Sequence, residues 1–262
     1  MSMGKMSKGN SSSCDCALDR DAVGVDGGMD TTADWDERLR LGVGSSTEVS
    51  ESFRVLRSKI LHPRDGRERV RTVMVTSALP REGKSFVSAN LGISLAHGVD
   101  QYSLLVDCDL RVPALAGLFG LPCGPGLVDY LEDRAQIADL IRKTSVDKLS
   151  ILASGRPPVN PAELLGSMRM HALIEELSER YEDRVLIFDS PPLQVASESL
   201  VLSQMVDYVI LVVRHGVSGS GIIKKVITDI GREKMLGVIF NGHKKNALSS
   251  MLLYKNDYLY DT

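Results

Sequence analysis

The sequence has few cysteines, little net charge and no long hydrophobic run. No apolar stretch approaches the roughly 18 to 20 residues of a membrane span, and the longest candidate covers only residues 206–213. The net charge of −3 argues against a nucleic-acid-binding surface, so we expect no nucleic acid as a partner. The beginning of the chain lacks the apolar core of a signal peptide, and we therefore expect a cytoplasmic protein. Zinc-site spacing is absent from the four cysteines, which are Cys14, Cys16, Cys108 and Cys123.

Composition divides the chain into three parts. Residues 1–46 are rich in glycine, serine and aspartate, and they contain one aromatic residue, Trp35. Such a segment buries too little apolar surface to offset its ordering entropy, so we expect it to be mostly disordered, with residues 35–41 as a candidate docking element. Residues 47–243 have the alternating apolar pattern of one folded domain, and we expect residues 244–262 to form a flexible tail that contains tyrosines.

A phosphate-binding loop is predicted near residue 80. A β-rich stretch, residues 72–76, leads into a turn that ends with Gly83, Lys84 and Ser85, and an amphipathic helix follows. In this context the N–H groups of the loop and of the helix N-terminus attract phosphate. Lys84 adds a positive charge for the β- and γ-phosphates, and the hydroxyl of Ser85 can bind Mg²⁺. The G-x-x-x-x-G-K-[ST] pattern is broken only by Ala78, where it requires glycine.

Beyond the loop, apolar strand-like segments alternate with helical ones. The strand-like segments are residues 102–106, 149–153, 184–188, 208–213 and 236–240. This alternation predicts an α/β fold, a mainly parallel sheet flanked by helices on both faces. Ligands of such sheets bind at the carboxyl ends of the strands, where the loop and four polar residues, Asp107, Asp109, Asp189 and Asn241, should converge.

Three aspartates at these strand ends fit phosphoryl-transfer chemistry. Asp189 ends a buried strand, where a phosphate-loop enzyme holds Mg²⁺ through water. Asp107 and Asp109 are separated by one residue, so on a strand they would point the same way and need a nearby cation. Asp107 could position or deprotonate a nucleophile, and Asp109 could help to hold Mg²⁺ or water.

A helix is predicted over residues 47–61, ending before Pro63. Glu51, Arg54 and Arg57 lie at intervals of three and form one charged stripe on it. The spacing alone is typical of a solvated face, although the arginines could also pair with carboxylates of a neighbouring subunit.

Three motifs make the chain resemble the bacterial tyrosine kinases. They read TSALPREGKS at residues 76–85, LLVDCDLR at residues 104–111 and LIFDSPP at residues 186–192. The stripe Glu51-x-x-Arg54-x-x-Arg57 is similar to the oligomerisation motif of that family. The resemblance runs from about Trp35 to the C-terminus, and NPAELL at residues 160–165 is most similar to the stand-alone cytosolic kinases of exosortase-linked exopolysaccharide clusters.

The resemblance implies ATP and Mg²⁺ as cofactors and a deviant Walker A loop. Lys84 would bind the phosphates as a catalytic residue, Asp107 would act on the tyrosine hydroxyl, and Asp109 would be a second essential acid. Mg²⁺ would be held by Ser85, Asp107 and Asp189. The remaining nucleotide contacts would come from Leu79, Pro80, Arg81, Glu82, Gly83, Lys84, Ser85, Phe86 and, at the adenine, Asn241. Arg81 departs from the family pattern, because this position is often glycine.

The resemblance also implies substrates and partners. The family phosphorylates its own tail tyrosines and thereby regulates exopolysaccharide synthesis and export. Tyr254, Tyr258 and Tyr260 would be the targets here, in a sparser cluster than the family usually carries, modified in trans within a homo-oligomeric ring. A membrane-bound chain-length-determinant protein, the polysaccharide co-polymerase, would act as activator and recruit the chain to the inner face of the membrane. A tyrosine phosphatase would be the opposing partner.

Two other functions fit the same fold. A partitioning or positioning ATPase would hydrolyse ATP to water, but such proteins usually carry an extra lysine where this chain has Leu79. A nucleotide-gated scaffold would bind ATP and a membrane partner without transferring phosphate. The complete set of Lys84, Ser85 and the three aspartates, together with the tail tyrosines, favours the kinase.

Overall fold

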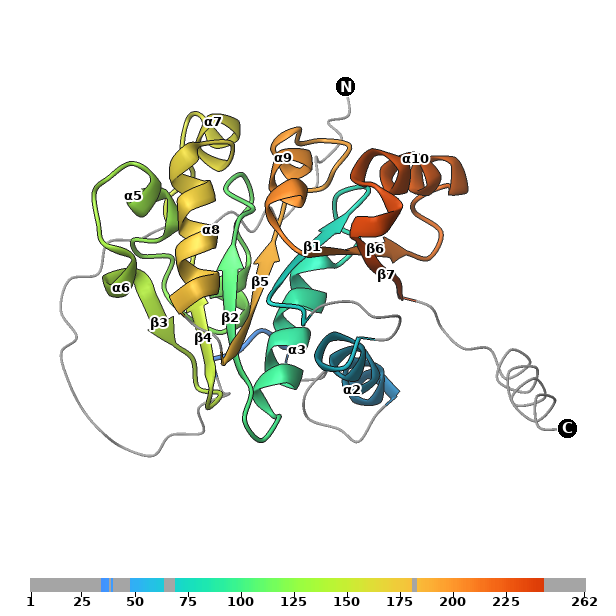
Figure 1. The fold of residues 1–262 in the computed structure, drawn as a ribbon, viewed down its shortest axis with the longest axis horizontal. Coiled ribbons are helices and arrows are strands. Elements are labelled where there is room, and N and C mark those ends of the chain that lie inside the picture. Colours follow the sequence, from blue (N-terminus) through green and yellow to red (C-terminus); the bar gives the residue numbers. More distant parts are fainter. Residues whose placement is uncertain (1–33, 38, 40–47, 64–68, 181–182, 243–262) are drawn as a thin grey trace, which may run out of the picture.

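A computed structural model of the chain describes residues 34–37, 39, 48–63, 69–180 and 183–242 (Figure 1). Its centre is a seven-stranded sheet in the order β3-β4-β2-β5-β1-β6-β7. The strands are β1 (Thr72–Ser77), β2 (Tyr102–Asp107), β3 (Ile141–Lys143), β4 (Leu149–Leu152), β5 (Arg184–Asp189), β6 (Tyr208–Arg214) and β7 (Met235–Asn241). All neighbouring strands pair in parallel except β3, which is antiparallel to β4.

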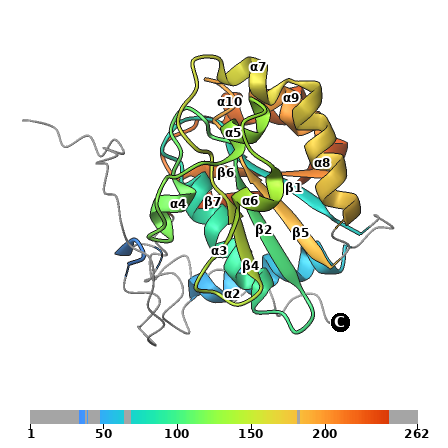
Figure 2. The ribbon, with the colours of Figure 1, turned by 90° about the vertical axis from the view of Figure 1, so that its left-hand side faces the viewer.

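Helices cover both faces of the sheet (Figures 1 and 2). One face is covered by α2 (Glu48–Leu61), α3 (Lys84–Ala96) and α4 (Leu115–Leu118). The other is covered by α5 (Leu127–Leu131), α6 (Ile137–Leu140), α7 (Pro161–Leu165), α8 (Met168–Arg180), α9 (Glu198–Met205) and α10 (Ser220–Ile230), and a 3-10 turn, η1 (Arg232–Lys234), precedes β7. The predicted α/β fold with a mainly parallel sheet is confirmed.

The alternation of side chains along β1 explains the two layers. Val73 and Val75 lie in the core on the side of α3, and Met74 lies in the core on the opposite side. Successive residues of a strand point to opposite faces, so a strand that is covered twice must be apolar at nearly every position. Because β1, β5 and β2 run in parallel, their carboxyl ends reach one edge together, and this edge carries the functional residues described below.

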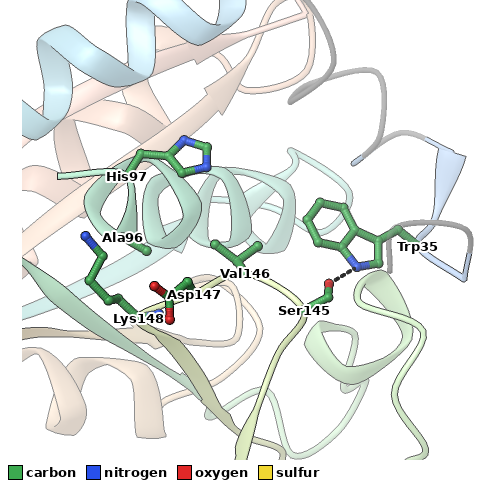
Figure 3. Close-up of a pocket in the computed structure, with 7 residues that line it drawn as sticks. All are labelled: Trp35, Ala96, His97, Ser145, Val146, Asp147 and Lys148. Atoms are coloured by element: carbon green, nitrogen blue, oxygen red, sulfur yellow. Dashed lines mark hydrogen bonds between the residues drawn. The ribbon is translucent and has the colours of Figure 1, made fainter. Parts of the chain in front are cut away.

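The candidate docking element packs against the domain. Trp35 is 5% exposed and Leu39 is fully buried, whereas Leu41 lies outside the described residues. The Trp35 indole N–H donates to Ser145 Oγ at 3.0 Å, and its ring meets Phe119 edge to face at 5.4 Å. Trp35 closes one side of a cavity of about 430 Å³ that also borders the end of α3 and Lys148 (Figure 3). Residues from before position 47 therefore contribute to the core, and the proposed boundary at residue 46 stays a prediction.

Among the described residues, no helix combines the length and the apolar character that crossing a bilayer requires.

Candidate active site

The phosphate-binding loop connects β1 to α3 with the geometry that its sequence predicts. The strand ends at Ser77, the helix begins at Lys84, and Gly83 between them has a φ of +96°. Arg81 also has a positive φ, +64°, which explains why glycine suits this position. The Arg81 side chain is exposed and is not buried within the loop.

Lys84 is the centre of the site. Its Nζ lies 2.7 Å from Asp109 Oδ2 and 3.8 Å from Asp189 Oδ2, and it contacts Ser85 Oγ at 3.2 Å. Burial acts to lower the pKa of the Lys84 ammonium, but the charges of Asp189 and Asp109 outweigh this effect and raise the pKa. Lys84 is therefore a fixed positive charge between Asp109, which follows β2, and Asp189, which ends β5.

Asp189 has one carboxylate oxygen that lacks a hydrogen bond. Ser88 donates to Oδ1 at 3.2 Å, whereas Oδ2 is buried and has no hydrogen-bond partner in the described structure. Burial raises the pKa of Asp189, and the charge of Lys84 together with the nearby hydroxyls of Ser85 and Ser88 offsets part of that effect. Oδ2 accepts no hydrogen bond and has the Lys84 ammonium 3.8 Å away, so it can still act as a ligand of a metal ion.

Asp107 is fully buried and organises the loop that follows β2. Its Oδ2 accepts N–H bonds from Ala114 and Leu115, both at 3.0 Å, and its Oδ1 accepts one from Asp109 at 3.2 Å. Burial and the nearby charge of Asp189 raise the pKa of Asp107 to about 7, although the bond from Leu115 and the charge of Lys84 act against this. In this conformation Asp107 thus holds the backbone that presents Asp109.

The prediction that Asp107 and Asp109 point the same way on one strand is wrong. The strand ends at Asp107, so Asp109 lies on the turn after it and does not share a strand face with Asp107. Asp109 reaches Lys84 because the turn is fixed by hydrogen bonds, including one from Val112 N–H to Asp109 Oδ1 at 3.1 Å. Asp109 therefore contacts Lys84 directly, whereas Asp107 acts on Lys84 only through its charge.

Three other residues predicted to contact the nucleotide, Asn241, Glu82 and Phe86, have defined contacts in the structure. The Asn241 amide lies against the loop, where its Nδ2 donates to the Glu82 carbonyl at 2.8 Å. The Glu82 side chain is buried within the loop, so only its backbone can face phosphate. Phe86 points its ring at Phe53 of α2, with centroids 6.4 Å apart, and it too can contribute to the nucleotide site through its backbone.

The charged stripe of α2 is divided in the structure. Arg54 pairs with Glu51 at 2.7 Å on the exposed side of the helix. Arg57 instead donates to the Ser94 carbonyl at 2.7 Å and thereby fastens α2 to α3. The proposed oligomerisation role of these residues stays a prediction, as do the phosphorylation sites Tyr254, Tyr258 and Tyr260, which lie outside the described residues.

Sequence reasoning missed three residues that shape the site. Ser88 donates to Asp189, and it lies one helical turn after Lys84 on the buried side of α3, a spacing that could have revealed it. Arg111 pairs with the fully buried Glu198 of α9 at 2.8 Å. No sequence signal links these last two residues, because they are 87 positions apart.

The donor set fits Mg²⁺ only together with a phosphate ligand. Among the described side chains, no group of three or more His, Cys, Asp or Glu residues is arranged to hold a metal ion. Mg²⁺ is commonly held by one or two carboxylates, several waters and the phosphates of a substrate. Asp189 Oδ2 accepts no hydrogen bond and lies 3.8 Å from Lys84, the first residue of α3, so it is compatible with such a shared site.

Known proteins of similar sequence are tyrosine-protein kinases. The chain is 34% identical over 223 residues to the tyrosine-protein kinase YwqD of Bacillus subtilis, which covers 83% of this chain and 92% of that protein. It is 32% identical over 209 residues to the tyrosine-protein kinase ptk of Acinetobacter johnsonii, covering 79% of this chain but only 28% of that longer protein. No protein-family model matches the chain.

A solved structure shows the same similarity in three dimensions. The kinase domain of the Escherichia coli tyrosine kinase ETK superposes with a TM-score of 0.73 at 28% sequence identity. The superposition covers 80% of this chain and 81% of that domain. The similarity therefore spans most of the described sheet and its helices.

Proposed function

The chain belongs to the family of bacterial tyrosine-protein kinases, and on that basis we propose that it transfers the γ-phosphoryl group of ATP to tyrosines of its own C-terminal tail. The observation that carries the proposal is the buried contact of Lys84 with Asp109 and Asp189 at the head of α3. Phosphoryl transfer needs a fixed positive charge and oriented carboxylates more than it needs a strong base. The tail supplies three of the seven tyrosines of the chain.

The proposed reaction assigns separate roles to the acidic residues. The tyrosine oxygen attacks the γ-phosphorus, the bond to the bridging oxygen breaks, and ADP leaves. The phenolic proton passes to Asp107, whose pKa of about 7 suits a proton acceptor near neutral pH. Its Oδ1 accepts a single N–H bond and so retains a lone pair for that proton. Asp109 keeps Lys84 in place.

Ser85, Asp107 and Asp189 are the proposed residues that hold Mg²⁺. When bound, Mg²⁺ would neutralise charge on the β- and γ-phosphates. Asp189 Oδ2, which accepts no hydrogen bond, supports this assignment. Ser88 would orient Asp189 through its bond to Oδ1.

We further propose that transfer takes place between subunits of a ring. The exposed pair Glu51 and Arg54 offers polar contacts for a neighbouring copy. Each phosphotyrosine adds about −1.5 to −2 charges, so three of them add more than the net charge of the whole chain. Modified tails would then be repelled from sites that hold ATP, and the ring would loosen.

The proposed setting is the control of exopolysaccharide synthesis and export. A membrane-bound chain-length-determinant protein, a polysaccharide co-polymerase, would activate the chain at the inner face of the membrane, and a tyrosine phosphatase would reset it. The motif resemblance supports this setting. Chromatography of the chain with the cytoplasmic part of such a partner tests it, and the absence of any complex would count against it.

Intact-mass measurement after incubation with ATP and Mg²⁺ tests the kinase proposal. Wild type should gain phosphate, and peptide mapping should place it on Tyr254, Tyr258 or Tyr260, whereas Lys84→Met should gain none. Turnover of ATP without added mass would instead identify an ATPase of the positioning type. If ATP binds and neither turnover nor added mass is found, even with the membrane partner present, the chain is a nucleotide-gated scaffold.

A further inference from the structure

The carboxylate of Glu82 bridges the phosphate-binding loop and the adjoining strand β6. Its Oε2 accepts the N–H of Leu79, three residues earlier in the loop, at 2.8 Å. Its Oε1 accepts the N–H of Arg214, the last residue of β6, at 3.2 Å. The side chain is fully buried, so water cannot replace these bonds if they are lost.

Asn241 holds the same residue from the end of β7. Its side-chain amide donates to the Glu82 carbonyl at 2.8 Å, and a Cβ added to Gly83 would lie only 2.1 Å from that amide nitrogen. Arg214 contributes a further bond, from Nη1 to the Arg81 carbonyl, at 3.3 Å. The second half of the loop is therefore fastened to the ends of two strands.

We propose that Glu82 and Asn241 are positioning residues that preform the phosphate-binding loop. Asn241 would then strengthen phosphate binding through Glu82, in addition to contacting the base of a bound nucleotide. Preformed N–H donors bind anions more tightly because the loop loses no further freedom on binding. One N–H of the Asn241 amide donates to Glu82, and the second N–H and the amide oxygen can still form hydrogen bonds with a bound base. This inference rests on the nucleotide site of the proposed function but not on phosphate transfer.

Inorganic tripolyphosphate separates the two roles of Asn241, because it has phosphates but no base. Calorimetry with tripolyphosphate and with ADP, both with Mg²⁺, would be run on wild type, Glu82→Gln, Asn241→Ala and the exposed control Glu179→Gln. We expect Glu82→Gln and Asn241→Ala each to weaken tripolyphosphate about tenfold, the loss typical of one unmet buried hydrogen bond. The control should bind as wild type does.

A double variant completes the test. If both residues act through one loop conformation, Glu82→Gln combined with Asn241→Ala should weaken tripolyphosphate much less than the product of the single effects. Loss of ADP binding with unchanged tripolyphosphate binding in Asn241→Ala would overturn the proposal and leave Asn241 as a base contact only. A lower melting temperature with unchanged affinities in both single variants would also overturn it. Neither measurement requires turnover, so failure of the kinase proposal would be seen separately.

Discussion

Lys84 and Asp109 form the closest ion pair of the site, with 2.7 Å between Nζ and Oδ2, although they lie on opposite sides of β2 in the chain order. Lys84 begins α3, and Asp109 lies on the turn after β2. Both side chains are nearly buried, and without Asp109 the Lys84 ammonium would keep only its longer pair with Asp189, at 3.8 Å. The pair holds the ammonium group in place before any nucleotide is present.

Removal of Asp109 should release Lys84. In Asp109→Asn the pKa of Lys84 should fall because one of the charges that raise it is gone, and the rate of tail phosphorylation should fall by about 100-fold or more. Timed mass spectrometry with ATP and Mg²⁺ measures this rate. Asp229→Asn, on helix α10 at the opposite face of the sheet, serves as a control and should match wild type. A rate for Asp109→Asn within threefold of wild type would contradict the assigned role.

Asp189→Asn should weaken the binding of Mg²⁺ without destabilising the fold. The carboxylate oxygen Oδ2, which accepts no hydrogen bond, would no longer be available to Mg²⁺, so the Mg²⁺ concentration for half-maximal rate should rise about tenfold or more. Thermal stability should hold or increase, since a carboxylate buried beside Asp107 and Asp109 is removed. A titration of Mg²⁺ at saturating ATP and a melting curve give both quantities. An unchanged Mg²⁺ requirement would remove Asp189 from the metal site.

The raised pKa of Asp107 predicts how stability depends on pH. Its pKa is about 7 in the folded chain and near 4 when unfolded, so between these values the folded state retains a proton that the unfolded state releases. Its contribution to the free energy of unfolding should therefore decrease as pH rises from about 4 to 7, by at most about 1.4 kcal/mol per pH unit.

Comparison with Asp107→Asn isolates this contribution. The stability of wild type relative to the variant should fall across this pH range and then level off. Denaturant unfolding at several pH values measures the difference. A flat difference between pH 4 and 7 would show that Asp107 has an ordinary pKa.

Trp35→Ala should destabilise the domain by about 3 to 5 kcal/mol, because a large buried ring that contacts Phe119 and Ser145 is lost. Nucleotide affinity should change little, since none of these contacts involves the loop. Denaturant unfolding and calorimetry with ADP check the two statements. Val159→Ala is the matched control, because Val159 is fully exposed. Equal stability of both variants would show that Trp35 adds nothing to the core.

Arg54 and Arg57 should behave differently despite their equivalent spacing. Arg54→Ala should reduce the size of the oligomer measured by light scattering and leave the melting temperature unchanged, because Arg54 contacts Glu51 and Ser50 of its own helix and fastens α2 to no other described element. Arg57→Ala should also lower the melting temperature, because it loses the bond to the Ser94 carbonyl that fastens α2. Identical melting temperatures for the two variants would contradict this division.

Much of the fold could be read from local patterns. The alternation of apolar runs located the strands β1, β2, β4, β5, β6 and β7 to within two residues, since strands buried on both faces must be apolar throughout. The short elements α4, α6 and β3 were not predicted, because each has only three or four residues, too few for a periodic signal. Helix α9, which has eight residues, was not predicted either.

The candidate site, like the fold, was predicted only in part from local sequence patterns. Local sequence patterns were enough to place Lys84 after a phosphate-binding loop and aspartates at the ends of two strands. Since parallel strands bring their carboxyl ends to one edge, these patterns also predicted that the residues lie near each other. The packed fold was needed to show that Asp107 supports a turn while Asp109 contacts Lys84, that Glu82 faces inward, and that Arg57 holds α2. These outcomes depend on hydrogen-bond partners far away in the sequence, and a buried polar group takes whichever partner the packed fold brings to it.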